Sequence, residues 1–117
     1  MQEQLERIEK RGANPDALNL ARVLVMTLSD LMPCCLTLDD DKSISLEWSA
    51  YGVYITIEPN LNIEYTSFSQ INPGQLDCTR VFSYPSQLEE LKTLLHDVLP
   101  ARKKLYYQKH SLLCTKL

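Results

Sequence analysis

The chain contains few side chains that could carry acid-base or nucleophilic chemistry. Across 117 residues these are two histidines and four cysteines: His96, His110, Cys34, Cys35, Cys78 and Cys114. A cysteine nucleophile needs a stabilised thiolate and a base within hydrogen-bond reach, and no local pattern around these residues indicates either. With no C-x-x-C spacing, we interpret the cysteines as reduced thiols that pack as small apolar groups in the core. No catalytic residue is therefore expected, and a thiol-dependent enzyme is kept as an alternative function.

Metal and phosphate sites are also disfavoured. The run Asp39-Asp40-Asp41 has carboxylates, but a calcium loop needs alternating ligands and a distant bidentate carboxylate. We interpret this run as a solvated turn. The chain has only three glycines, which lie too far apart to build a phosphate-binding loop. We expect no metal and no cofactor.

An alternating segment, residues 44–68, is the element around which the remaining chain is organised. Apolar residues recur at every second position in three runs: Ile44, Leu46 and Trp48; Val53, Ile55 and Ile57; Ile63 and Tyr65. Such alternation predicts three adjacent antiparallel strands with one apolar and one wet face. Weaker patterns at residues 36–38 and 76–82 could raise the number to five. We expect Trp48 to be buried, because aromatic residues dominate core area.

Helical patterns flank this segment on both sides. The pattern of residues 2–11 predicts a short helix that would be only marginally stable in isolation. Asn14-Pro15-Asp16 is a typical start for a second helix, which we expect to reach about Met32. A third leucine-rich helix is predicted over residues 86–99, ended or kinked by Pro100, with a separate helix over residues 101–113. The predicted fold is α+β: N-terminal helices, an antiparallel meander of three to five strands, and C-terminal helices packed on one sheet face. We expect a single domain, residues 1–117, with a marginal N-terminal helix at 1–13 and a basic C-terminal segment at 102–117.

Charge is distributed unevenly along the chain. Residues 1–101 carry 15 acidic and 7 basic side chains, whereas residues 102–117 carry 5 basic side chains and no acidic one. An acidic body disfavours binding to the nucleic-acid backbone. No apolar run is long enough to span a membrane, and the first residues do not resemble a signal peptide, so we expect a cytoplasmic protein without membrane contact.

Two groups of residues are candidates for binding a partner. The first, predicted on or next to the wet sheet face, consists of Glu47, Tyr51, Tyr54, Glu58 and Glu64. Tyrosine provides contact area at low entropic cost, and the carboxylates favour a basic protein partner, including a nucleic-acid-binding protein. The second group lies in the basic tail: Arg102, Lys103, Lys104, Tyr106 and Tyr107. It suits a protein partner or a second copy in a homodimer; direct nucleic-acid binding through this tail is a disfavoured alternative.

The strand order also carries a resemblance to known proteins. The chain resembles a group of small bacterial and phage accessory proteins over residues 15–65 and, more loosely, over residues 86–99. The shared order is a leucine-rich helix that ends at a proline, here Pro33, a strand similar to Ile44-Ser45-Leu46-Glu47-Trp48, a glycine-containing turn and two further alternating strands. The first hairpin turn is usually glycine-rich in that group, and here it is Asp39-Asp40-Asp41-Lys42. The resemblance implies an antitoxin, immunity or anti-defence protein that acts by binding. The size and helix-sheet-helix order are also similar to acidic chaperones of secretion systems.

Together these observations predict a non-enzymatic regulator or inhibitor of bacterial or phage origin, including the anti-CRISPR type. It would act by stoichiometric occupation of a partner's surface. A secretion-type chaperone, a nucleic-acid binder and a thiol-dependent enzyme are the alternatives.

Overall fold

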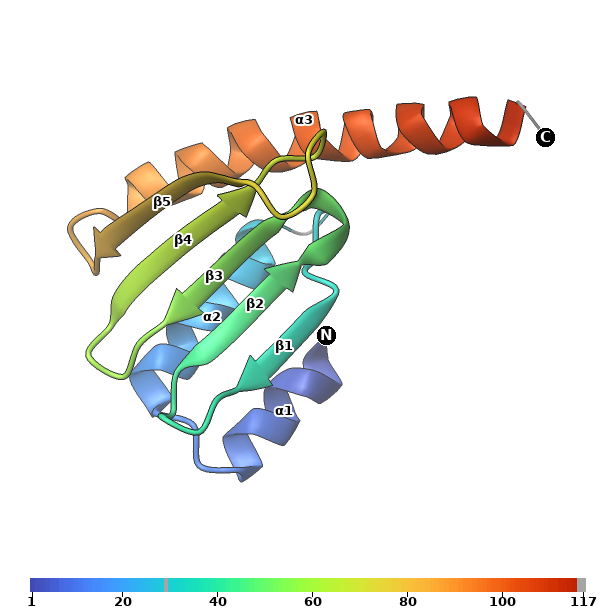
Figure 1. The fold of residues 1–117 in the computed structure, drawn as a ribbon. Coiled ribbons are helices and arrows are strands. Elements are labelled where there is room, and N and C mark those ends of the chain that lie inside the picture. Colours follow the sequence, from blue (N-terminus) through green and yellow to red (C-terminus); the bar gives the residue numbers. More distant parts are fainter. Residues whose placement is uncertain (29, 116–117) are drawn as a thin grey trace.

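The alternating segment forms the centre of a five-stranded antiparallel sheet (Figure 1). The structure is a computed structural model that describes residues 1–28 and 30–115, with side chains described as far as Lys109. The strands follow one another across the sheet in chain order: β1 (Cys35–Leu38), β2 (Ile44–Trp48), β3 (Val53–Ile57), β4 (Asn62–Phe68) and β5 (Leu76–Ser83). The predicted meander is therefore confirmed, with both of the weaker strands present.

The register of the strands places every predicted apolar position on the same face. Leu46 lies opposite Leu36 and Ile55, and Ile55 lies opposite Tyr65, so the apolar residues form continuous rows across the sheet. Trp48 is 2% exposed, as expected, and its Nε1 donates a hydrogen bond to the carbonyl of Leu31. The three helices lie on this covered face, and the opposite face is uncovered (Figure 1).

Helix α1 (Gln2–Lys10) is short but docked. It buries Leu5 and Ile8, and the Gln4 side chain accepts a hydrogen bond from the backbone N–H of Leu36. Arg22 of the next helix forms an ion pair with Glu9. Because β1 is an edge strand, the contact from Gln4 satisfies a backbone donor that would otherwise face solvent.

Helix α2 (Pro15–Thr27) begins as predicted and ends earlier than predicted. The Asn14 side chain accepts hydrogen bonds from the N–H groups of Asp16 and Ala17. The expected extension to Met32 is wrong: the helix ends at Thr27, and Met32 is exposed. Leu28 leaves helical geometry, with φ of −110° and ψ of 44°. Pro33 restricts only the residue before it and so does not account for an end at Thr27.

The prediction of two C-terminal helices is also wrong, because α3 (Leu88–Thr115) runs through Pro100. Leu91, Leu95 and Leu99 are fully buried, whereas Pro100 and His96 are exposed. The proline therefore lies on the solvent side of the helix, where water can bind the His96 carbonyl that it leaves without a helical donor. Helix α3 continues past the end of the sheet (Figure 1).

Tyr65 places an ionisable phenol in the buried core. Burial raises the pKa of the Tyr65 phenol above its ordinary value of 10.0, and Tyr65 is 2% exposed. Above pH 10 the phenol ionises in the unfolded chain but stays neutral in the folded one. Its contribution to stability is therefore complete below pH 10 and is lost as the pH rises through the folded pKa.

We expect the free energy of unfolding to fall above pH 10, and to fall less steeply in a Tyr65→Phe variant. Urea titrations followed by circular dichroism at several alkaline pH values measure both slopes. Tyr65→Phe will also lose the hydrogen bond to Ser67, which lowers stability equally at neutral pH and so leaves the slope as the informative quantity. Identical slopes in the two proteins would contradict the assignment to Tyr65.

In the described part of the chain, none of the helices combines the length and apolarity needed to cross a membrane.

Candidate functional site

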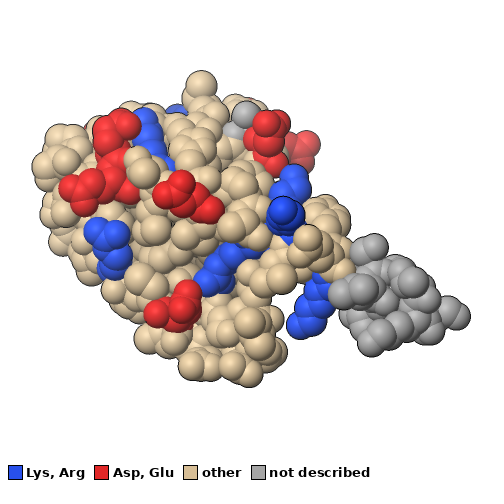
Figure 2. Space-filling view, turned by 90° about the horizontal axis from the view of Figure 1, so that it is seen from above, with Lys and Arg blue, Asp and Glu red and all other residues tan. Residues whose placement is uncertain are grey.

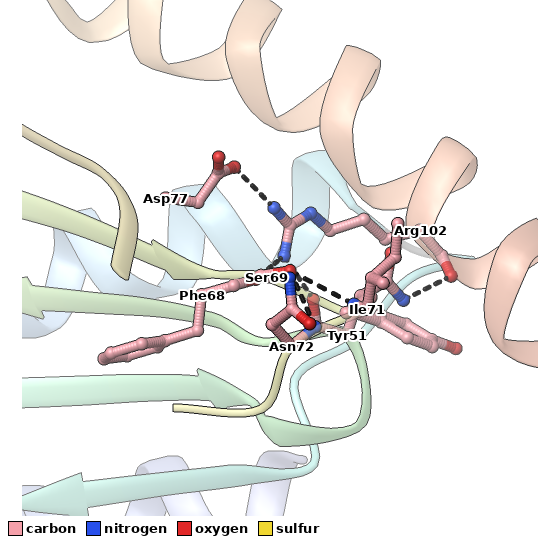
Figure 3. Close-up of polar contacts among 8 residues, drawn as sticks. Tyr51, Phe68, Ser69, Ile71, Asn72, Asp77 and Arg102 are labelled. Atoms are coloured by element: carbon pink, nitrogen blue, oxygen red, sulfur yellow. Dashed lines mark hydrogen bonds and ion pairs between the residues drawn. The ribbon is translucent and has the colours of Figure 1, made fainter. Parts of the chain in front are cut away.

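Arg102 of α3 joins four chain segments at one end of the sheet (Figure 3). Its Nη1 donates to the carbonyl oxygens of Tyr51, at 2.8 Å, and Phe68, while Nη2 contacts Asp77 Oδ2 at 2.9 Å. The Gln70 side chain donates to the Arg102 carbonyl at 3.0 Å. The arginine side chain is only 14% exposed. A planar guanidinium can make these bonds simultaneously, and thereby fixes the helix against the sheet.

Gly52 makes this close approach feasible. It follows the short 3-10 helix η1 (Ser49–Tyr51) in a left-handed conformation, with φ of 69°. A Cβ atom at this position would lie 3.0 Å from the Phe68 carbonyl oxygen and 3.2 Å from Arg102 Nη1. The Gly52 carbonyl also accepts a hydrogen bond from the Phe68 N–H. The turn between β2 and β3 is thus tied to the end of β4 because glycine has no side chain.

The connection between β4 and β5 forms an ordered loop beside the arginine. Ser69 Oγ accepts hydrogen bonds from the N–H groups of Ile71 and Asn72, and the Ser69 N–H donates to the carbonyl of Gln75. The turn predicted at Asn72-Pro73-Gly74 is present. These bonds hold Ile71 in a position where it is 77% exposed.

An apolar groove of about 850 Å³ lies between this loop, the β2–β3 turn and the helix. We call it the loop–helix groove; its lining includes Tyr54, Phe68, Ile71, Leu105, Tyr106 and Lys109. The Tyr54 and Phe68 rings meet edge to face at 5.7 Å, and Tyr51 meets Tyr106 in the same way at 5.8 Å. Burial raises the pKa of the Tyr51 phenol, with smaller contributions from Tyr107 and Tyr106.

The uncovered side of the sheet carries most of the predicted partner-binding residues. Strand alternation puts the following residues on this open face: Cys35, Thr37, Ser45, Glu47, Tyr54, Thr56, Glu64, Thr66, Phe68, Thr79 and Val81, with Glu58 directly after β3 on the same side. Glu47 lies opposite Tyr54. Tyr51 is not on this face; it lies in η1 and packs against α3.

The carboxylates of the open face lack basic neighbours. Arg80 is the single Lys or Arg within the five strands, and it lies opposite Tyr65 on the covered side, with its guanidinium over the Phe82 ring. Among the ion pairs of the described residues, none includes Glu47, Glu58 or Glu64. On the open face Glu47 lies directly opposite Tyr54 and Glu64 lies diagonally from it, while Glu58 lies four residues further along the chain from Tyr54.

The predicted tail residues have different environments. Arg102 is engaged inside the protein and Tyr106 packs on Tyr51, whereas Lys104 is exposed, Lys103 is half-buried and Tyr107 is 58% exposed. Lys and Arg side chains gather near the point where the grey end segment begins in Figure 2, and Asp and Glu side chains are scattered over the body. No local sequence signal indicates the inward role of Arg102, since its bonding partners lie at least 25 residues away.

The expectation that the cysteines lie in the core is wrong for Cys34 and Cys35, whereas Cys78 packs against the edge of the core. Cys34 is exposed and its Sγ lies 3.1 Å from both the Glu47 carbonyl oxygen and Ser49 Oγ; Cys35 and Cys78 are half-buried. Positions next to strand ends and on the less covered strands leave these thiols partly accessible, and all three are free. Within the described ranges, no group of three or more His, Cys, Asp or Glu residues is arranged to hold a metal. The side chains of His110 and Cys114 lie outside the described residues.

Comparison with known proteins adds no relative to this description: no protein-family model, no curated protein and no solved structure matches the chain.

Proposed function

We propose that this protein is a non-enzymatic regulator or inhibitor that binds a basic protein through the open face of its sheet. The observation that carries the proposal is the presence of Glu47, Glu58 and Glu64 on the face that exposes Tyr54, with no basic residue on that face of the strands and no ion pair to any of the three among the described residues. A basic surface laid on this face would neutralise the carboxylates, and Tyr54 would supply central contact area.

The loop–helix groove extends this surface towards apolar side chains. Tyr54 and Phe68 belong to both the open face and the groove, while Ile71 and Leu105 border the groove further along. A partner suited to this site would therefore present Lys or Arg residues next to an exposed apolar side chain. Nucleic-acid-binding proteins have basic surfaces of this kind, and acidic side chains can occupy the positions of phosphates there.

This mode of action corresponds to antitoxins, immunity proteins and anti-defence proteins, including the anti-CRISPR type, in bacteria and phages. Each acts by occupying a partner's surface in a fixed stoichiometry. The free thiols of Cys34, Cys35 and Cys78 fit a reducing compartment, so the proposal includes action in the cytoplasm.

Charge reversal tests the open face. We expect the triple variant Glu47→Lys, Glu58→Lys, Glu64→Lys to bind the partner more than about 100-fold more weakly, because each attractive contact becomes repulsive. The matched control is Glu3→Lys, Glu6→Lys, Asp97→Lys, which changes the net charge equally at exposed positions of α1 and α3. The tagged proteins would be incubated with nuclease-treated lysate of the source cells, and captured proteins quantified by mass spectrometry.

A partner captured by the wild type and the control, and lost with the open-face variant, is the expected result. Equal capture by both variants would remove the open face from the proposal. Circular dichroism of each variant shows whether the fold is retained; reversals at solvent-facing positions should change the free energy of unfolding by less than about 1 kcal/mol.

A further inference from the structure

The distal helix, residues 102–115 of α3, starts against the body at Arg102 and Tyr106 and continues past the end of the sheet (Figure 1). At 1.5 Å per residue these 14 residues span about 21 Å. The radius of gyration is 15.0 Å, against about 13.4 Å for a typical compact chain of this length. Leu105 and Tyr107 are 41% and 58% exposed. A helix of this length is marginal in water without packing, so an additional contact would stabilise it.

The distal helix carries positive charge that has no ion-pair partner among the described residues. Lys103, Lys104 and Lys109 take part in none of those ion pairs, whereas Arg102 is bonded to Tyr51, Phe68 and Asp77. Helical spacing places Lys103, Lys104 and Tyr107 on one side, because residues three and four apart are neighbours on a helix. This side combines two ammonium groups with an exposed aromatic ring.

The open face matches this helix in charge and in size. Its carboxylates are unpaired, and five strands at a spacing of about 4.8 Å give a width of about 19 Å, close to the length of the distal helix. Within one chain the helix meets the open face only at its edge, where Leu105 and Lys109 line the same groove as Tyr54. The buried Leu95 and Leu99 and the bonds of Arg102 fix the rest of α3 on the covered side. A distal helix laid across an open face therefore has to come from a second molecule.

We infer that this protein associates with a second copy of itself, the distal helix of each copy seated on the open face of the other. Lys103 and Lys104 face Glu47, Glu58 and Glu64, and Tyr107 lies near Tyr54. Each copy gives its distal helix to the other and receives the other's helix on its own open face, so the two copies form a closed two-fold dimer. No open face is left to bind a third copy.

A charge-swap series measured by analytical ultracentrifugation tests this arrangement. The wild type should sediment as a dimer at high micromolar concentration, and added salt should weaken the dimer because it screens the charges. Lys103→Glu with Lys104→Glu should raise the dissociation constant at least about 30-fold, and the triple open-face reversal should do the same. Combining both sets in one chain should restore dimerisation, because the attractive pairs are re-formed with opposite sign.

The control Lys10→Glu with Lys42→Glu changes the same net charge at exposed positions outside the distal helix and should leave the dimer unchanged. A monomeric wild type at all concentrations would overturn the inference. A dimer that is insensitive to both reversals, or a combined variant that stays monomeric while folded, would overturn it equally.

The wild-type chain gives a second test that needs no variant. A carbodiimide joins lysine and carboxylate side chains that are in contact, and a mixture of normal and nitrogen-15-labelled protein marks links between copies. We expect mixed-isotope links from Lys103 or Lys104 to Glu47, Glu58 or Glu64. Mixed-isotope links confined to other residues would contradict the arrangement.

One consequence rests on the proposed function as well: the distal helix of a second copy would compete with the partner for the open face. The Lys103→Glu, Lys104→Glu variant should then be monomeric and bind the partner at least as tightly as the wild type. Failure of the proposed function removes partner binding from every variant but leaves the ultracentrifugation result intact, so the two failures are distinguishable.

Discussion

Replacement of Arg102 by alanine is expected to lower the free energy of unfolding by about 2–4 kcal/mol. The substitution removes two hydrogen bonds to backbone carbonyls and the contact with Asp77, all from a side chain that is 14% exposed. It also leaves the carbonyls of Tyr51 and Phe68 without this donor. Urea denaturation followed by tryptophan fluorescence measures the change, since Trp48 is the single tryptophan.

Three further variants separate the roles of Arg102. Arg102→Lys should recover little of the loss, because one ammonium group cannot reproduce the planar fork that contacts both carbonyls. Asp77→Asn should cost less than about 1 kcal/mol, because Asp77 is 57% exposed and exposed ion pairs contribute little. Lys104→Ala, at an exposed position two residues further on, should be nearly neutral. Equal losses for Arg102→Ala and Lys104→Ala would contradict the role of Arg102 in fixing α3.

Replacement of Gly52 by alanine is expected to destabilise the protein by about 2–3 kcal/mol. The left-handed backbone disfavours any side chain, and the new Cβ would lie 3.0 Å from the backbone oxygen of Phe68, which cannot move freely within the sheet. The same Cβ would press on Arg102 Nη1, so part of this loss should vanish when Arg102 is already replaced.

Gly74 offers a matched control for this substitution. It also has a positive φ, 85°, but a Cβ at this position would have no atom within 4 Å. Gly74→Ala should therefore lower the free energy of unfolding only by the backbone cost of about 1 kcal/mol. The loss for Gly52→Ala should be larger by about 1–2 kcal/mol. Thermal or urea unfolding of the two variants gives this difference directly, and equal losses would show that the contact with Phe68 and Arg102 is unimportant.

The sheet could be predicted from sequence because its determinants are local. Alternation through Ile44, Leu46 and Trp48, and again through Val53, Ile55 and Ile57, follows from a pleated chain with one buried face. The capping by Asn14 was recognisable for the same reason, since an N-cap and its donors lie within three residues. The open face then followed from the positions between the apolar ones, including Glu47 and Tyr54.

The loop–helix groove and the hydrogen bonds of Arg102 could not be predicted in this way. The sequence places Arg102 among the candidate partner contacts of the basic tail, but its bonding partners Tyr51, Phe68 and Asp77 come from three distant segments of its own chain. The continuity of α3 through Pro100 was missed because the cost of a proline depends on whether water can reach the freed carbonyl, which is a property of the folded surface. Both features depend on tertiary packing that no sequence window contains.

The most direct test of the account is to compare carboxyl labelling of the open face in the free and the bound protein. Carbodiimide-activated labelling with glycine ethyl ester, in buffer and in nuclease-treated lysate of the source cells, reports the accessibility of each carboxylate by mass spectrometry. The Lys103→Glu, Lys104→Glu variant, which we expect to be monomeric, keeps a second copy from covering the face. We expect labelling of Glu47, Glu58 and Glu64 to fall at least about tenfold in the lysate, because a bound partner excludes the reagent, while labelling of Glu3, Glu6 and Asp97 stays unchanged. Unaltered labelling of the three open-face carboxylates, with a partner bound, would contradict it.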